Sequence, residues 1–310
     1  MQKPCTSGTS FIEHTSAGTR SGTRNGVTFQ FDWNPPATNA GPVTFYVAGN
    51  AANGNSASTG DLIYTSNLQM DPVVPVAPTV ASGNIVSGAT FAAGPVGAFS
   101  WVTVYGSNLS STTRAWTDSD FINGAMPNSL DGVSVVLTFF GAPRLASIGY
   151  VSPTQVNFLV PSDTSATTVQ VQLKNPAGIT TPLPITVQAS APQLLTTDGK
   201  HAFGTHADGS RLDTAAPGET IVLYATGCGP TIPALVPGQV PTQAASLSAL
   251  PSVLIGGAAA QVTSGGVVIG TGGLYQIAVQ VPVNAVAGDE TVVVQAGAFT
   301  SASTLLTVKR

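Results

Sequence analysis

The amino-acid sequence predicts an all-β fold in which one β-sandwich occurs twice in tandem. Many segments alternate apolar and polar residues with a period of two, which sends successive side chains to opposite faces of a sheet. No segment sustains the apolar stripe, repeating about every 3.6 residues, that marks an amphipathic helix. A set of strand motifs also recurs in the same order later in the chain. A further β segment precedes both copies, so we expect two sandwiches and a partial one.

The strand predictions rest on residue type as well as on alternation. Val, Ile, Thr and aromatic residues alternate within each segment, and Gly, Pro, Asn or Asp bound it. In chain order the predicted strands are residues 27–33, 42–49, 100–106, 132–140, 167–173, 219–227, 275–282 and 290–297.

Closely spaced prolines in residues 71–83 predict a linker. Proline has no N–H to donate to a sheet and favours an extended, polyproline-like backbone. The predicted organisation is therefore a partial β segment over residues 1–70, the linker over 71–83, a first sandwich over 84–189 and a second over 190–310.

The internal repeat keeps one register over most of each copy. Three pairs of residues recur at nearly equal intervals, and a closing strand follows each set. Two sibling sandwiches explain this pattern because each needs its own pair of sheets to bury the alternating apolar faces. The matched residues are Tyr105 with Tyr224, Val133 with Val253, Gln155 with Gln276, and residues 184–188 with 305–309.

The composition indicates a folded protein of extracellular character. Charged residues make up 8% of the 310 residues and hydrophobic residues 43%, which is ample apolar surface for a core. The 10 Lys and Arg residues and the net charge of −4 argue against nucleic-acid binding. No apolar run approaches the ~20 residues of a membrane span. We expect a secreted or cell-surface protein whose export signal lies upstream of this sequence.

Both copies resemble known families. In the first, "VTVYGSNLS", "LDGVSVVLTFFGAP" and "YVSPTQVNFLVP" resemble IPT/TIG-type immunoglobulin-like domains. In the second, "HADGSRLDTAAPGETIVLYATGCGP" and "GLYQIAVQVP" are similar to the uncharacterised Solibacter-type C-terminal module of secreted acidobacterial proteins. Cys228 departs from that pattern, which tends to carry a large apolar residue there. The resemblance spans about residues 84–310 and implies an immunoglobulin-like, secreted or surface bacterial protein with no known activity, cofactor or catalytic residue.

The N-terminal segment has a resemblance of its own. Residues 29–68, "FQFDWNPPATNAGPVTFYVAGNAANGNSASTGDLIYTSNL", resemble the closing half of a reeler-like, choice-of-anchor domain, another extracellular β-sandwich. Half of a sandwich exposes an apolar face and an unpaired strand edge. We therefore expect this segment to be mobile, repacked, or completed by another chain.

The loop over residues 112–127 is the first candidate binding site. It holds Trp116, Asp118, Asp120 and Phe121, and an exposed aromatic ring beside carboxylates is typical of a surface that stacks sugars. The alternative is that Trp116 and Phe121 cover the end of the core. Trp101, which sits in an alternating strand, is expected inside a core. Aromatic residues in such loops cover a core more often than they bind a ligand, and both interpretations stay open.

The loop over residues 198–213 is the second candidate. His201, His206, Asp208 and Asp213 could hold a metal or share a proton. However, histidines five residues apart lie on opposite faces of a strand, and the Gly and Asp content is typical of a connecting turn. A structural role is therefore favoured over a metal or catalytic one.

The function that follows is a non-catalytic structural, spacer or adhesion role. The sequence has no G-x-S-x-G motif, and no cofactor or catalytic residue is predicted. Three alternatives stay open: carbohydrate binding through residues 112–127, self-association through exposed strand edges, and hydrolysis by the 198–213 loop. The partner expected is a polysaccharide or another surface protein. Cys5 and Cys228 fall in different modules, so we expect no bridge between them, and Cys228 is predicted to be a buried free thiol.

Overall fold

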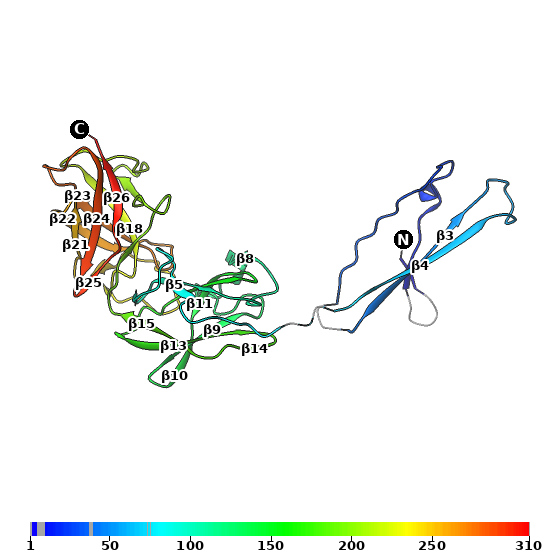
Figure 1. The fold of residues 1–310 in the computed structure, drawn as a ribbon, viewed down its shortest axis with the longest axis horizontal. Helices are drawn as coiled ribbons and strands as arrows, with labels where there is room; N and C mark the ends of the chain where they lie inside the picture. Colours follow the sequence, from blue (N-terminus) through cyan, green and yellow to red (C-terminus); the bar gives the residue numbers. More distant parts are fainter. Residues whose placement is uncertain (1, 5–9, 37–39, 73, 75, 310) are drawn as a thin grey trace. The chain divides into compact units, whose positions relative to one another are not determined.

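The computed structural model describes residues 2–4, 10–36, 40–72, 74 and 76–309. The chain divides into two compact units, Met1–Val74 and Pro75–Arg310 (Figure 1). Strands dominate both, and the helices of the described residues are two single-turn 3₁₀ helices, η1 (Ser16–Gly18) and η2 (Asp118–Asp120). None of the helices in this described part is long and apolar enough to cross a membrane. The predicted all-β fold is confirmed.

The N-terminal unit contains two separate hairpins. Strands β1 (Gln2–Pro4) and β2 (Ser10–Ile12) form the short one, and β3 (Val43–Ala51) and β4 (Leu62–Met70) form the long one. Each hairpin is antiparallel, and no third strand joins either sheet among the described residues. Among the described residues no second sheet packs on β3 and β4, and the assignment of this unit as half of a sandwich stays a prediction.

The predicted strand over residues 27–33 is wrong. This segment is not assigned to a strand, and it pairs with no strand among the described residues. Its alternation nevertheless serves packing, because the rings of Phe31 and Trp33 lie 5.8 and 5.2 Å from the ring of Phe45. Alternation places side chains on one face but does not supply the hydrogen-bonding neighbour that a strand requires.

The first sandwich comprises β5 to β15 (cyan to green in Figure 1). One sheet has the order β10-β9-β13-β15-β6, with β14 beside β13, and the other has the order β5-β7-β12-β11-β8. The bounds are β5 Ile85–Ser87, β6 Val96–Gly97, β7 Trp101–Tyr105, β8 Arg114–Ala115, β9 Ser134–Phe139, β10 Ala142–Leu145, β11 Ser147–Val151, β12 Gln155–Leu159, β13 Thr167–Asn175, β14 Gly178–Ile179 and β15 Leu183–Gln188.

The second sandwich comprises β16 to β26 (yellow to red in Figure 1). One sheet runs β16-β18-β23-β22, and the other runs β22-β21-β24, with β25 and β26 both paired to β24. The bounds are β16 Gln193–Leu194, β17 Gly204–His206, β18 Thr220–Thr226, β19 Thr231–Ile232, β20 Ser246–Leu247, β21 Ser252–Ile255, β22 Ala258–Val267, β23 Tyr275–Gln280, β24 Gly288–Ala296, β25 Phe299–Thr300 and β26 Thr304–Val308.

Strand β22 belongs to both sheets of the second sandwich. Its first three residues pair with β21 and its later residues pair with β23, with a register shift after Val262. An extra residue at such a shift bends a strand, which lets it pass from one sheet to the other. In the first sandwich the corresponding chain is divided at Ala146 into β10 and β11, which lie in different sheets.

The repeat is visible in the strand register. Gln155 pairs with Tyr105 across β12 and β7, and Gln276 pairs with Tyr224 across β23 and β18. These two matched pairs therefore occupy equivalent sites. The match of Val133 with Val253 is displaced, because Val133 precedes β9 whereas Val253 lies inside β21.

Each sandwich encloses a core of its own. The first is filled by fully buried residues such as Val104, Leu137 and Phe158. The second is filled by residues such as Leu223, Ile277 and Val294. The alternating faces predicted from the sequence therefore point inward, and two-sheet packing supplies most of the stabilising burial.

Candidate functional site

The two sandwiches meet at an apolar junction, which is the most extensively built feature outside their cores. Phe99, Met126 and Leu159 of the first sandwich are 1%, 5% and 3% exposed and belong to the buried cluster of the second. The ring of Phe99 lies 6.1 Å from that of Tyr275, edge to face. The Tyr275 hydroxyl donates a hydrogen bond to the carbonyl of Gly229, so this buried aromatic ring has its polar end satisfied.

Trp101, the first residue of β7, fixes the centre of the junction. Its indole Nε1–H donates a 2.8 Å hydrogen bond to the carbonyl of Gly272, and its backbone N–H donates a 3.3 Å hydrogen bond to the hydroxyl of Thr226. The ring has room because its neighbours are glycines. A Cβ on Gly149 would lie 2.6 Å from the ring, and one on Gly273 would lie 2.9 Å from it.

The candidate loop over residues 112–127 completes the junction. The ring of Trp116 lies 5.4 Å from Trp101 in an edge-to-face arrangement and 5.0 Å from Phe121. Both Trp116 and Phe121 are partly buried against the core of the second sandwich. The backbone N–H of Met126 donates a 2.8 Å hydrogen bond to the carbonyl of Gly238. The aromatic residues of this loop therefore face the neighbouring sandwich.

A charged network holds this loop on the first sandwich. Arg114 forms ion pairs with Asp120 at 2.8 Å and with Asp131 at 2.9 Å. Asp120 also accepts a hydrogen bond from the backbone N–H of Thr117, which caps η2. Hydrogen bonds from Arg114 hold the pKa of both carboxyl groups below the ordinary value, and the two carboxylates raise the pKa of Arg114. The polar residues thus position the aromatic ones.

The predicted ligand-binding residues are therefore divided between two environments. Trp116, Asp120 and Phe121 contact other parts of this chain, whereas Asp118 is exposed in η2. Ile122, which follows Phe121, is 73% exposed. These contacts are those of a loop that covers the end of a core, the alternative that the sequence favoured. Ligand binding by the outer residues of the loop stays a prediction.

The histidines of the 198–213 loop have different partners. His201 Nδ1 lies 2.7 Å from the carboxylate of Asp198, and its Nε2 lies 3.6 Å from the carboxylate of Asp289 on β24. These carboxylates, Asp198 foremost, raise the pKa of His201. His206 Nδ1 instead contacts the carboxylate of Glu219 at 2.5 Å. Asp289 lies on β24 and Glu219 directly precedes β18, so these two contacts tie the loop to other parts of the second sandwich.

The carboxylates of this loop are also held locally. Asp208 accepts hydrogen bonds from the backbone and the hydroxyl of Ser210, as a turn residue does. Asp213 forms an ion pair with Arg211 at 2.9 Å. In the part of the chain that the structure describes, no three His, Cys, Asp or Glu side chains are grouped to hold a metal ion. Metal or catalytic use of the loop stays a prediction.

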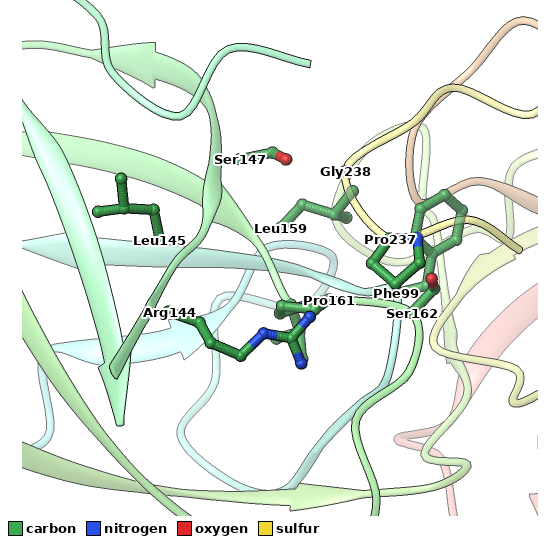
Figure 2. A pocket seen from close by; sticks show the side chains of 10 residues that line it. Phe99, Arg144, Leu145, Ser147, Leu159, Pro161, Ser162, Pro237 and Gly238 are labelled. Carbon is green, nitrogen blue, oxygen red and sulfur yellow. The ribbon is translucent and has the colours of Figure 1, made fainter. Parts of the chain in front are cut away.

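A small cavity lies along another side of the junction. Its volume is about 110 Å³, well below the ~300 Å³ of the smallest usual ligand pockets. Figure 2 shows Arg144 and Pro161 of the first sandwich and Pro237 and Gly238 of the second around it. The Arg144 guanidinium already forms an ion pair with Asp163 at 3.0 Å. Its lining residues come from both sandwiches, so the cavity lies between them.

The described cysteine, Cys228, is a buried free thiol. Cys228 is buried at 3% exposure and free, and burial raises the pKa of its thiol. Since the thiolate is the reactive form, this cysteine behaves as a small apolar residue. The backbone carbonyl of Cys228 accepts a 2.8 Å hydrogen bond from Ser190, which lies in the connection between the sandwiches. Cys5 lies outside the described residues.

The junction was not predicted from the sequence. Trp101 was expected in a core, but its partners Gly272 and Gly273 were not singled out. Two adjacent glycines, one residue before the strand that begins at Tyr275, were the available signal, since such positions often mark a close approach of another chain segment.

Comparison with known proteins gives weak likenesses of fold. The sequence matches no family model and no curated protein sequence. Among solved structures, the titin Ig tandem A164-A165 is 11% identical with a TM-score of 0.21, covering 75% of this chain and 96% of that chain. The Bacteroides ovatus mixed-linkage glucan utilization locus protein SGBP-B, in complex with a heptasaccharide, is 12% identical with a TM-score of 0.30, covering 88% and 54%. Such values carry no argument about ligands.

Proposed function

We propose that this chain is a non-catalytic structural module of a secreted or cell-surface protein, in which the tandem sandwiches act as a rigid spacer or adhesion stalk. The observation that carries the proposal is the junction. Flexible tandem domains are joined by exposed linkers with few contacts across them. Here the core of one sandwich continues into side chains of the other.

Rigidity follows from the kind of contacts at the junction. Trp101 donates one hydrogen bond from its backbone and one from its ring to the second sandwich. A Cβ on Gly97 would lie 2.5 Å from the carbonyl oxygen of Gly227, so the two backbones touch. Rotation of one sandwich against the other would break these hydrogen bonds and expose buried aromatic surface. Each of these costs free energy, on the order of 1 kcal/mol per hydrogen bond.

The finer assignment rests on sequence motifs. The tandem copies resemble IPT/TIG and Solibacter-type modules, and residues 29–68 resemble half of a reeler-like domain, all from extracellular proteins. The low charge content of 8% agrees with that location. We therefore place the protein outside the bacterial cytoplasm. Fractionation of cells producing the gene in its natural reading frame tests this, and a purely cytoplasmic product would contradict it.

Distance measurement between spin labels tests the rigid spacer. Thr168 on β13 and Thr291 on β24 are exposed and lie on different sandwiches. The double substitution Thr168→Cys and Thr291→Cys, with Cys5→Ser, provides two labelling sites while Cys228 stays buried. A rigid junction gives one narrow distance distribution.

The matched control carries the same labels together with Trp101→Ala, which removes the central ring and its hydrogen bond. We expect this variant to give a broader distribution. A broad distribution in the chain with Trp101 intact would overturn the proposal, because the sandwiches would then move independently.

A further inference from the structure

The hairpin of β3 and β4 exposes an apolar face that a folded domain would normally bury. Leu62, Tyr64 and Leu68 are 58%, 62% and 63% exposed, and they share one face of the hairpin with Val47, which is 57% exposed. An isolated two-stranded hairpin is marginally stable in water, and three or more strands are usually needed. The hairpin therefore gains stability from any further strand that pairs with it.

The outer edge of β4 is the more exposed of the hairpin's two edges. All nine residues of β4 are exposed, and within the described residues β3 is its sole strand partner. The first three residues of β3 are partly covered, and the rings of Phe31 and Trp33 pack there against Phe45. Neither strand contains Lys, Arg, Asp, Glu or Pro, so β4 lacks the charges and prolines that usually keep edge strands from pairing.

The sequence of β4 is complementary to itself in the antiparallel direction. A two-fold axis through Ser66 pairs all nine residues, whereas an axis through either neighbour pairs fewer. On the apolar face Leu62 then opposes Met70, and Tyr64 opposes Leu68. On the other face Thr65 opposes Asn67, and Ile63 opposes Gln69. Aromatic–aliphatic pairs of this kind stabilise sheets. The numbers of the opposed residues differ by an even number, and alternate residues of a strand point their N–H and C=O groups toward the same neighbour. The N–H and C=O groups of β4 that point away from β3 therefore face the equivalent groups of the second copy.

We propose that β4 pairs with β4 of a second copy of this chain, forming a four-stranded antiparallel sheet with a continuous apolar face across both hairpins. The arrangement is isologous, which is the commonest symmetry of protein dimers. Paired strand edges bury less than the ~1,200 Å² of standard interfaces. The dimer is therefore weak, with a dissociation constant on the order of 10–100 µM.

The flanking carboxylates make the register testable. Asp61 precedes β4 and Asp71 follows it. In the proposed register Asp61 of each copy opposes Asp71 of the other, so like charges meet at both ends of the paired strands. These pairs of like charges weaken the dimer in this register. Raising the salt concentration from 0.05 to 0.5 M screens exposed charges and is expected to strengthen association.

Sedimentation equilibrium of the full chain from about 1 µM to 1 mM tests the proposal. We expect a reversible monomer–dimer equilibrium. Ser66→Lys places two like charges on the axis and weakens association on the order of tenfold. Asp71→Lys converts both end pairs to opposite charges and strengthens association by a similar factor. Both substitutions reduce the net negative charge, so an effect of net charge alone would move them in the same direction.

A mixture of variants identifies the axis. Ser66→Lys and Ser66→Glu each weaken association alone, whereas an equimolar mixture restores it, because the two new charges are then opposite. Hydrogen exchange of residues 62–70 slows as concentration rises. A chain that stays monomeric at 1 mM overturns the proposal, and so does association that Ser66→Lys leaves unchanged or that gives no slowing in residues 62–70. Association through another face of this chain, or with a different β protein, would leave hydrogen exchange of residues 62–70 independent of the concentration of this chain.

Discussion

Substitution of Trp116 by alanine separates the two uses that its sequence context allowed. If the ring stacks on a sugar at the surface, its removal abolishes binding and leaves folding unchanged. If the ring belongs to the junction, its removal destabilises the protein. The structure places it 5.4 Å from Trp101 and 5.0 Å from Phe121, partly buried against both cores. We therefore expect loss of stability.

The magnitude follows from burial. Removing a fully buried Trp side chain costs about 3–5 kcal/mol. Because Trp116 is only partly buried, the expected loss is about 2–4 kcal/mol, of which the aromatic pair with Trp101 contributes about 0.5–1.5 kcal/mol. For two sandwiches that unfold together, this lowers the melting temperature by about 5–12 °C.

Calorimetry of the full chain measures this shift, and Ile122→Ala is the matched control. Ile122 lies in the same loop but is 73% exposed, so its truncation is expected to change stability by less than about 0.5 kcal/mol. A Trp116→Ala variant that melts within about 1 °C of the unaltered chain refutes the reasoning. Loss of retention on a polysaccharide in that variant, with the melting temperature kept, would instead support a binding role.

Three other outcomes are expected. Gly273 has φ +73°, and a Cβ there would lie 2.6 Å from Leu159, so Gly273→Ala is expected to lower the free energy of unfolding by about 2–4 kcal/mol in denaturant titration. Gly270 has φ +78° with nothing within 4 Å of a Cβ, so Gly270→Ala is expected to cost about 1 kcal/mol. Equal costs for the two variants would contradict a tight junction. Asp198 raises the pKa of His201, so the protonated histidine stabilises the fold below about pH 6.5, and this stabilisation is lost as pH rises through the folded pKa. His201→Ala is therefore expected to flatten the dependence of the melting temperature on pH between pH 5.5 and 8.5. Parallel curves of melting temperature against pH for the variant and the unaltered chain would contradict this. With Cys5→Ser, Cys228 reacts with a thiol reagent only on unfolding, and rapid reaction of the native protein would contradict its burial.

The fold was largely predictable because the residue pattern that predicts a strand lies within the strand itself. Period-two alternation located β7, β13 and β24 within a few residues, since burial of one face requires that pattern whatever the partner. The failure at residues 27–33 has the same origin. Phe31 and Trp33 do face an apolar neighbour, but the sequence cannot show whether that neighbour also supplies hydrogen bonds.

The roles of the polar loops were less predictable because their partners are distant in sequence. His201 contacts Asp289, and His206 contacts Glu219, both outside the 198–213 loop. A cluster of His and Asp residues looks the same in a sequence whether its members converge on one point or diverge to separate strands. Only the arrangement of β17, β18 and β24 distinguishes these cases.

The junction shows how a duplicated sandwich acquires a role that one copy lacks. The 112–127 loop of the first copy and the loop around Gly238 of the second copy connect equivalent strands. The two loops are in contact, because the backbone N–H of Met126 donates a hydrogen bond to the Gly238 carbonyl and Ala125 forms a β-bridge with Gln239. Met126 is 5% exposed and belongs to the buried cluster of the second copy, so part of the apolar surface of the first sandwich is covered by its sibling. Strand motifs repeat in the sequence, but this contact arises where the repeat ends, in loops whose sequences differ.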